Sequence, residues 1–426
     1  MQLSSFGVTR STFTLPNGLR CVVFERPGMP VNARIAFKAG GRYDPAGKEG
    51  LAHYVEHMIV AGTQKFPTKT DLATYIENYG GIFGASTQKE EMYVNAAIGD
   101  PADLDIAFNA LEQMLTKSLF RDKAIANERQ AVLGEIGNWE ANPASKIWDV
   151  MYRLFFQETA LGRSTVGTVG TVNSIQQPEL LQFVREMLTA ERGVVIVSGG
   201  ATAEEVKNSA LKHLINIPQS GRVGDASEIM INRANPIMIE AKENEQLQVR
   251  LGFRTCNLQS NDTVPLDLIA TILGGGRASS LTRILRQEQG LVYSVAAGSN
   301  HMSSGGWWSV NTTAPKAKLQ RVLDSTCLEF QRVYDGGITA AELEFAKNKT
   351  IKSTLRLMQT SQAWVDFHSR QALYGDAAWS LSDYLQAVAD TSLKDVAGVG
   401  AKYFLPGAWY LGMVGNVTEQ DFDVNY

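Results

Sequence analysis

The sequence has little cysteine, no long apolar run and no strongly basic segment. Its three cysteines, Cys21, Cys256 and Cys327, lie far apart and form no CxxC pair, so they provide neither a zinc knuckle nor a redox motif. We expect them to be buried free thiols. No run of about 18 apolar residues is present, which argues against a membrane-spanning helix. The first residues lack a basic segment followed by an apolar run, so we expect a cytoplasmic chain.

The charge and size of the chain limit its function and its domain organisation. A net charge of −4 and the lack of a Lys/Arg-rich run give no reason to expect nucleic acid as a partner. The composition, 44% hydrophobic and 20% charged, is that of a folded protein. Because 426 residues exceed the size at which a single hydrophobic core usually stops growing, we expect two domains.

The second half of the sequence repeats the pattern of the first half. Each half has an extended segment before a helical one, then an amphipathic helix opened by proline, and finally a short apolar strand that runs into glycine. Three pairs of landmarks recur 213, 214 and 215 residues apart: Gly62 and Gly275, Pro101 and Pro315, and Gly200 and Gly415. Such constant spacing indicates a duplication.

The repeat predicts an α+β fold of two homologous, duplicated domains, each a mainly antiparallel sheet covered by helices. We assign residues 1–220 to the first domain and 236–426 to the second. The segment 221–235 between them is polar and contains glycine, as linkers between domains tend to do.

A pentapeptide in the first half carries the chemistry. Two of the five histidines lie in HYVEH, residues 53–57. On a helix, residues four apart lie one turn above each other, so His53 and His57 can bind the same metal ion. Glu56 lies beside them and can accept a proton from a metal-bound water. The alternative is that these are ordinary surface or core residues. The remaining histidines are isolated and receive no role: His213, His301 and His368.

Two histidines are one ligand short of a zinc site, and a second segment of the first half offers carboxylates. Glu128 and Glu135 are seven residues apart, about two helical turns, and therefore face the same way. One of them can bind the metal while the other orients a ligating histidine.

HxxEH with a distant glutamate is the signature of the inverted zinc peptidases. The flanking sequences resemble the pitrilysin and mitochondrial processing peptidase family over nearly the whole chain: LPNGL at 15–19, GLAHYVEHM at 50–58 and ERQAVLGE at 128–135. The resemblance implies a peptidase that binds Zn²⁺ through His53, His57 and Glu135. It also implies that Glu128 is an additional functional glutamate.

The second half contains a further block of the family. LRQEQGLVY at residues 285–293 is similar to the family segment LRExxGLxY. The resemblance implies that Arg286 and Tyr293 assist catalysis by contacting substrate near the scissile bond. Without it, this segment predicts only a helix end capped by Gly290. The positions 213 residues after the histidines and Glu56 carry no ligand: Leu266, Ile269 and Ala270.

One segment departs from the family pattern. Residues 80–87 read GGIFGAST, where the family usually has GGxxNAxT, so Gly84 replaces asparagine. We expect an extended segment at 82–95 to bind substrate by adding the peptide as a further strand. The predicted substrate-binding residues are Gly84, Ala85, Ser86 and Thr87.

These features predict a zinc-dependent endopeptidase, and the resemblance implies that it cleaves peptides or unfolded segments in an enclosed chamber. The resemblance implies a homodimer, or a heterodimer with a related subunit. A catalytically silent structural subunit, like the core proteins of respiratory complex III, is the main alternative. A nucleotide-binding function would rest on glycines 274–276, which lack both GxxxxGK[ST] and GxGxxG.

Overall fold

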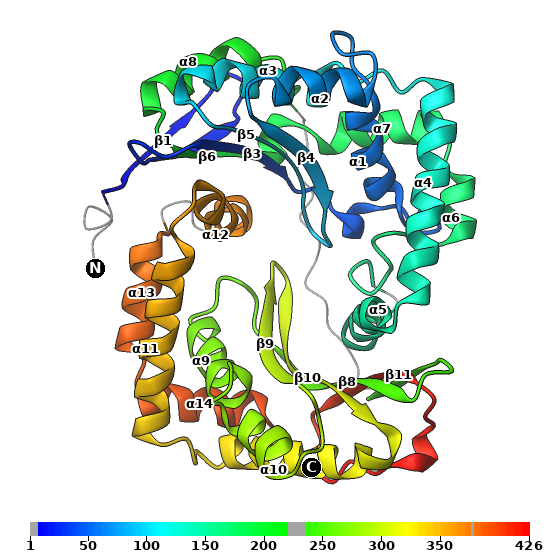
Figure 1. Cartoon of the computed structure of the whole chain (residues 1–426), viewed down its shortest axis with the longest axis vertical. Helices are drawn as coiled ribbons and strands as arrows, with labels where there is room; N and C mark the ends of the chain where they lie inside the picture. Colours follow the sequence, from blue (N-terminus) through cyan, green and yellow to red (C-terminus); the bar gives the residue numbers. More distant parts are fainter. Residues whose placement is uncertain (1–6, 158, 220–235, 376–378) are drawn as a thin grey trace. The chain divides into compact units, whose positions relative to one another are not determined.

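The computed structural model describes residues 7–157, 159–219, 236–375 and 379–426 (Figure 1). The chain forms two compact units, each built from three segments. Unit 1 comprises residues 1–137, 163–225 and 356–382, and unit 2 comprises residues 138–162, 226–355 and 383–426. The predicted linker at 221–235 lies outside the described residues. None of the described helices has an apolar stretch long enough to cross a lipid bilayer.

Unit 1 contains a sheet of six strands in the order β1-β2-β6-β3-β5-β4. All neighbouring strands are antiparallel except β2 and β6, which are parallel. The strands are β1 (Thr9–Thr14), β2 (Arg20–Glu25), β3 (Val31–Phe37), β4 (Ile82–Thr87), β5 (Met92–Ile98) and β6 (Gly193–Gly199). The extended segment expected at 82–95 is therefore a hairpin of two strands, because residues 88–91 turn the chain back.

Helices cover both faces of the unit 1 sheet, with α3 and α12 on opposite sides in Figure 1. Because both faces are covered, β3 and β6 are buried at every position. Arg34 of β3 reaches Asp366 of α12 at 2.5 Å. The helices are α1 (Leu51–Ala61), α2 (Lys69–Glu77), α3 (Leu104–Thr116), α4 (Asp122–Ala141), α6 (Val169–Ser174), α7 (Gln177–Met187), α8 (Ala203–His213) and α12 (Ser361–Tyr374).

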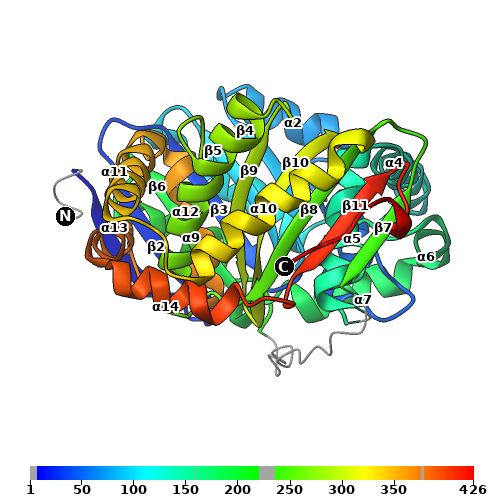
Figure 2. The same ribbon diagram turned by 90° about the horizontal axis from the view of Figure 1, so that it is seen from below.

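Unit 2 repeats this sheet with five strands in the order β7-β11-β8-β10-β9. Figure 2 shows β11 between β7 and β8, and the pair β7 and β11 is parallel like β2 and β6. The strands are β7 (Ile237–Ala241), β8 (Gln246–Thr255), β9 (Val295–Met302), β10 (Gly305–Pro315) and β11 (Tyr410–Gly415). The predicted α+β fold with two duplicated, mainly antiparallel sheets is confirmed.

The helices of unit 2 include one from the first half of the sequence. Helix α5 (Pro143–Phe156) packs on β7, β8 and β11, whereas α12 from the second half packs on the sheet of unit 1. Each unit therefore contains one helix from the other half of the sequence, so a single boundary near residues 221–235 does not describe both units. The other helical segments are α9 (Thr263–Gly274), a π-helix at Thr282–Glu288, α10 (Leu319–Tyr334), α11 (Ala340–Leu357), α13 (Leu381–Asp390) and α14 (Leu393–Tyr403).

The landmarks of the repeat occupy matching places in the two units. Gly62 is the C-cap of α1 and Gly275 is the C-cap of α9. Gly415 ends β11 with φ 147°, and the glycine that matches it in unit 1 is Gly199, which ends β6 with φ 146°, and not the predicted Gly200 one residue later. This backbone conformation favours glycine. The repeat in the sequence therefore reflects repeated backbone requirements as well as repeated apolar patterns.

Candidate metal centre

Helix α1, which carries the HxxEH motif, is fixed at its N-terminus by a buried carboxylate. Asp44 accepts hydrogen bonds from the amides of Gly50 and Ala52, both at 2.8 Å. Burial raises the pKa of Asp44 to about 7, and the two amide hydrogen bonds oppose that shift. Asp44 thus accepts hydrogen bonds from amides at the start of the helix that have no partner within the helix. Sequence reasoning missed this residue, whose signal is an acidic side chain shortly before a helix that begins at glycine.

Helix α1 is also tied to α4, which carries the two glutamates. The hydroxyl of Tyr54 donates a hydrogen bond to the carbonyl of Ile125. Arg129 lies over the ring of Tyr54 at 5.8 Å and donates to the carbonyls of Asn173 and Ile175, both at 2.7 Å. These contacts fix α4 relative to both α1 and the C-terminal end of α6.

Three side chains converge between α1 and α4. His53 Nε2 lies 3.2 Å from one carboxylate oxygen of Glu135, and His57 Nε2 lies 3.5 Å from the other. One potential ligand atom from each of these three residues lies within 4.8 Å of the others. His53 is 8% exposed, whereas the Glu135 side chain is 51% exposed, so the group is accessible from one side.

The spacing of these atoms fits a zinc ion. Two atoms that each lie about 2.1 Å from a tetrahedral ion are about 3.4 Å apart. The two nitrogen–oxygen distances, 3.2 Å to one oxygen of Glu135 and 3.5 Å to the other, are close to that value. Two histidines and one glutamate form a donor set that leaves a fourth position open in hydrolytic zinc sites. The chemistry of the donor set therefore suits a catalytic zinc.

Glu128 takes a different position from Glu135. Its carboxylate accepts a hydrogen bond from His57 Nδ1 at 3.0 Å, on the far side of the ring from Nε2. Burial alone would lower the pKa of His57, but this hydrogen bond and the neighbouring carboxylates outweigh burial and raise it. The hydrogen bond with His53 has the largest effect on Glu135 and, with the His57 charge, holds the pKa of that carboxyl below its usual value.

Glu56 lies on the same helix and is half-buried. Its charge contributes to raising the pKa of His57, which places the carboxylate in the electrostatic environment of the histidine pair. Glu56 is not one of the three residues whose ligand atoms converge. It is therefore free to accept a proton rather than to bind the metal.

The corresponding helix of unit 2 has no such group. Leu266, Ile269 and Ala270 of α9 occupy the positions that match the histidines and Glu56, and all three are buried. They belong to the hydrophobic core of unit 2. In this copy of the repeat, apolar side chains that pack in the core occupy the positions of the potential metal ligands.

Arg286 and Tyr293 lie together in unit 2. The guanidinium carbon of Arg286 is 5.3 Å from the centre of the Tyr293 ring, and Tyr293 is 83% exposed. Arg286 belongs to the π-helix, which ends before Gly290 at φ 59°. The glycine cap expected from the sequence is thus present together with the Arg/Tyr pair. Both residues belong to a different unit from His53, His57 and Glu135.

The predicted substrate-binding residues, Gly84 to Thr87, lie on β4, which is the edge strand of the unit 1 sheet. β4 pairs with β5 alone, so one of its sides carries no partner strand among the described residues. β4 also contacts α1, the helix with the HxxEH motif. Gly84 is opposite Asn95 of β5, which supplies a carboxamide close to where the family pattern has one.

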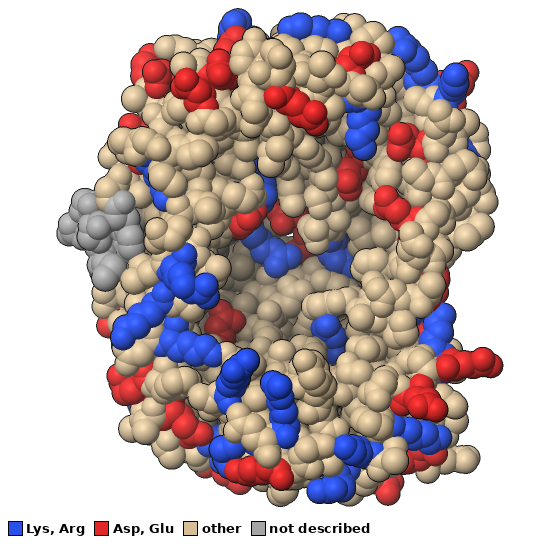
Figure 3. Space-filling model, viewed as in Figure 1, with Lys and Arg blue, Asp and Glu red and all other residues tan. Residues whose placement is uncertain are grey.

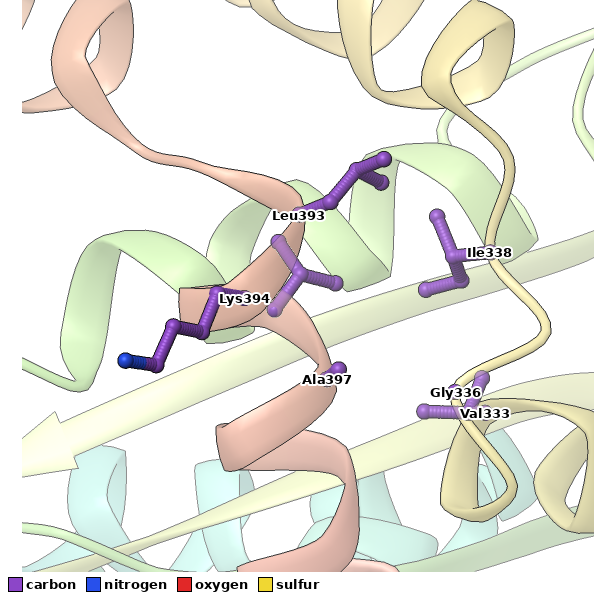
Figure 4. Close-up of a pocket in the computed structure, with 7 residues that line it drawn as sticks. Val333, Gly336, Ile338, Leu393, Lys394 and Ala397 are labelled. Atoms are coloured by element: carbon purple, nitrogen blue, oxygen red, sulfur yellow. The ribbon is translucent and has the colours of Figure 1, made fainter.

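A pocket in unit 2 has different chemistry. It lies between the end of α10 and the start of α14 and has a volume of about 280 Å³ (Figure 4). Its lining is apolar apart from Lys394: Val333, Gly336, Ile338, Leu393, Val396 and Ala397. It contains no histidine, carboxylate or thiol, so it offers no catalytic group.

On the face seen in Figure 3, acidic and basic side chains are interspersed over both units.

The cysteines differ from expectation at one position. Cys21 and Cys327 are buried free thiols as expected, but Cys256 is partly exposed. It follows the last residue of β8, where the chain leaves the sheet. The expectation of burial is therefore wrong for Cys256.

Comparison with protein families assigns the chain to a family of peptidases. Residues 22–169 match the family described as Insulinase (Peptidase family M16), and residues 174–350 match the Peptidase M16 inactive domain. The first match contains α1 and the second contains α9. The chain belongs to peptidase family M16.

Relatives that are named as proteases or peptidases match this chain over most of its length. An uncharacterized zinc protease of Streptomyces coelicolor is 28% identical over 403 residues, covering 92% of this chain and 86% of its own length. The beta subunit of the mitochondrial-processing peptidase of Dictyostelium discoideum is 23% identical over 425 residues, which cover 96% of this chain and 90% of that subunit.

Solved structures share the fold. A peptidase M16 inactive domain from Pseudomonas fluorescens superposes with a TM-score of 0.88 at 18% identity, covering 96% of this chain and 99% of that chain. A chain of complex III from Candida albicans superposes with a TM-score of 0.83 at 17% identity, covering 97% of this chain and 98% of that chain. One fold therefore occurs both in a peptidase family and in a respiratory complex.

Proposed function

We propose that this chain is a zinc-dependent endopeptidase that cleaves peptides or unfolded segments. The observation that carries the proposal is the convergence of His53, His57 and Glu135, whose potential ligand atoms all lie within 4.8 Å of one another and form a donor set that zinc prefers. The names of the relatives support it. A bound zinc would polarise the scissile carbonyl and make a bound water acidic.

The chain's own groups would do the remaining work. The carboxylate of Glu56 accepts the proton of the attacking water and then transfers it to the leaving nitrogen. Glu128 holds the ring of His57 with Nε2 turned toward Glu135. The free side of β4 binds the substrate backbone as an added strand, and Arg286 and Tyr293 contact the substrate near the scissile bond.

The proposed assembly is a homodimer that encloses a chamber, with a heterodimer of related subunits as the alternative. In this assembly the zinc group of one subunit and the Arg286/Tyr293 pair of the other act on the same peptide. The assignment of the two groups to separate units is compatible with such sharing.

Two substitutions test the site and separate the base from the ligand. Glu56→Gln should keep about one zinc per chain but lose turnover by on the order of 10²–10⁴. Glu135→Gln should lose the metal itself, because it removes a charged ligand. Zinc content by atomic spectroscopy and cleavage of a peptide library are the measurements. Equal loss of zinc in both variants would contradict the roles assigned here.

A catalytically silent structural subunit is the second candidate function. The likeness to a chain of complex III favours it, since that chain has the same fold within a respiratory assembly. Metal analysis distinguishes the two. A folded protein that takes up no zinc and cleaves no peptide supports the structural role, whereas chelator-sensitive cleavage supports the peptidase.

A further inference from the structure

Three reactive side chains in unit 2 lie together outside the proposed peptidase site. Cys256 follows β8, Asp267 lies on α9 and His301 lies on β9. His301 Nδ1 is 4.0 Å from Cys256 Sγ, and His301 Nε2 is 3.3 Å from a carboxylate oxygen of Asp267. The imidazole therefore lies between a thiol and a carboxylate, in the order that activates a sulfur nucleophile.

The imidazole is held in its charged form. Its side chain is 10% exposed, and burial alone would lower the pKa of His301. The hydrogen bonds with Asp267 and Cys256 outweigh burial and raise the pKa to about 9. At neutral pH an imidazolium thus stands beside the sulfur, and its positive charge stabilises negative charge that develops there.

The other two cysteines have no such environment. Cys21 and Cys327 are 1% and 4% exposed. Burial raises the pKa of each of these thiols to about 12, so both stay protonated and inaccessible at neutral pH. Cys256 is the partly exposed cysteine and also the one that faces a histidine. The chain therefore contains its own unreactive controls.

We propose that Cys256, His301 and Asp267 form a thiol modification site that reacts with low-molecular-weight disulfides. The Cys256 thiol loses its proton to solvent, and the resulting thiolate, stabilised by the His301 imidazolium, attacks one sulfur of the disulfide, forming a new S–S bond as the old one breaks. The departing sulfur leaves as a thiolate and takes a proton from solvent according to its own pKa, while His301 stays charged. Overall, one thiol and one disulfide give a mixed disulfide on Cys256 and one released thiol, while Asp267 orients the ring throughout.

The site does not depend on the peptidase proposal, because it uses none of the zinc group or the Arg286/Tyr293 pair. The test uses the folded, full-length chain and 5,5′-dithiobis(2-nitrobenzoate), whose aromatic thiolate is released visibly on reaction. We expect one fast-reacting thiol per chain at neutral pH, with the other two reacting only on unfolding. Cys256→Ser should abolish the fast phase.

His301→Asn should slow the fast phase by about tenfold or more, because it removes the positive charge beside the sulfur. His213→Asn is the matched control. His213 is also a buried histidine, and its two ring nitrogens contact Glu112 at 2.8 Å and Asp105 at 2.9 Å, but it lies in unit 1, whereas Cys256 lies in unit 2. This control should leave the rate unchanged.

A fast phase that survives in Cys256→Ser, or an unchanged rate in His301→Asn, would overturn the proposal. If His301→Asn does not fold, the wild-type protein supplies the second measurement. Its fast thiol should react at pH 7 at least as quickly as free N-acetylcysteine, despite partial burial. A slower reaction would show that the neighbouring imidazolium gives no activation and would also overturn the proposal.

Discussion

His57 Nδ1 and a carboxylate oxygen of Glu128 lie 3.0 Å apart, so one glutamate of α4 holds the ring whose other nitrogen faces Glu135. Removal of this acceptor should let the ring rotate and should weaken zinc binding. We expect Glu128→Ala to lower zinc affinity by about 10–100-fold. Competition with a chromophoric chelator measures the change.

The control for this prediction lies on the same helix. Glu140 of α4 pairs with Lys146 and is remote from the histidines in sequence. Glu140→Ala should leave zinc affinity unchanged. An equal loss of affinity in the two variants would mean that disruption of α4, and not loss of the His57 contact, causes the effect.

Much of this site could be predicted because the determinants are local. The four-residue spacing of His53 and His57 and the seven-residue spacing of Glu128 and Glu135 fix which side chains share a helix face. Spacing alone could not decide which glutamate meets Nε2 and which meets Nδ1. That assignment depends on how α4 crosses α1, which tertiary contacts such as the Tyr54 hydrogen bond determine.

Other features escaped prediction for the same reason. The exchange of α5 and α12 between the units leaves no local signal, because an amphipathic helix has the same pattern whichever sheet it covers. The hairpin at residues 82–98 was expected as one extended segment, since its turn contains neither glycine nor proline. The exposure of Cys256 depends on where β8 leaves its sheet.

The N-terminus of α1 should be sensitive to its buried cap. Asp44→Ala leaves the amides of Gly50 and Ala52 without their acceptor, so we expect the free energy of unfolding to fall by about 1–3 kcal/mol. Urea unfolding measures the loss. Asp71→Ala removes an exposed carboxylate that accepts hydrogen bonds from the amide and hydroxyl of Thr68 at the start of α2, and it should cost less, because water replaces the lost acceptor. Equal costs would contradict the importance of burial at Asp44.

The packing of α12 on unit 1 should weaken in acid through His368. Burial lowers the pKa of His368 to about 4, against an ordinary value of 6.5. Between these values the unfolded chain binds a proton that the folded chain does not, so the folded state loses up to about 1.4 kcal/mol per pH unit as pH falls.

His368→Phe keeps an aromatic ring against Phe24 and Trp364 but removes the titrating group. We therefore expect the stability of the wild-type protein to fall more steeply than that of His368→Phe between pH 6.5 and pH 4. Urea midpoints at several pH values provide the comparison. Parallel pH profiles would show that the buried histidine is not the source of the acid sensitivity.

The last prediction concerns the proposed sharing of the active site between subunits. If the zinc group of one chain acts with Tyr293 of the other, two inactive homodimers should complement each other. Glu56→Gln chains and Tyr293→Phe chains that exchange subunits would form heterodimers with one doubly altered site and one intact site. Random exchange should restore about a quarter of wild-type activity, because about half of the dimers are mixed and each has one intact site of two.

The same experiment can contradict the shared site. If Tyr293 acts with the zinc group of its own chain, every site in the mixture carries one of the two substitutions and no activity returns. Mass spectrometry of the intact dimers establishes that exchange has taken place. Mixing either variant with itself is the control, and it should give no recovery in either case. Verified exchange without recovered activity would therefore assign Tyr293 to its own chain or remove it from catalysis.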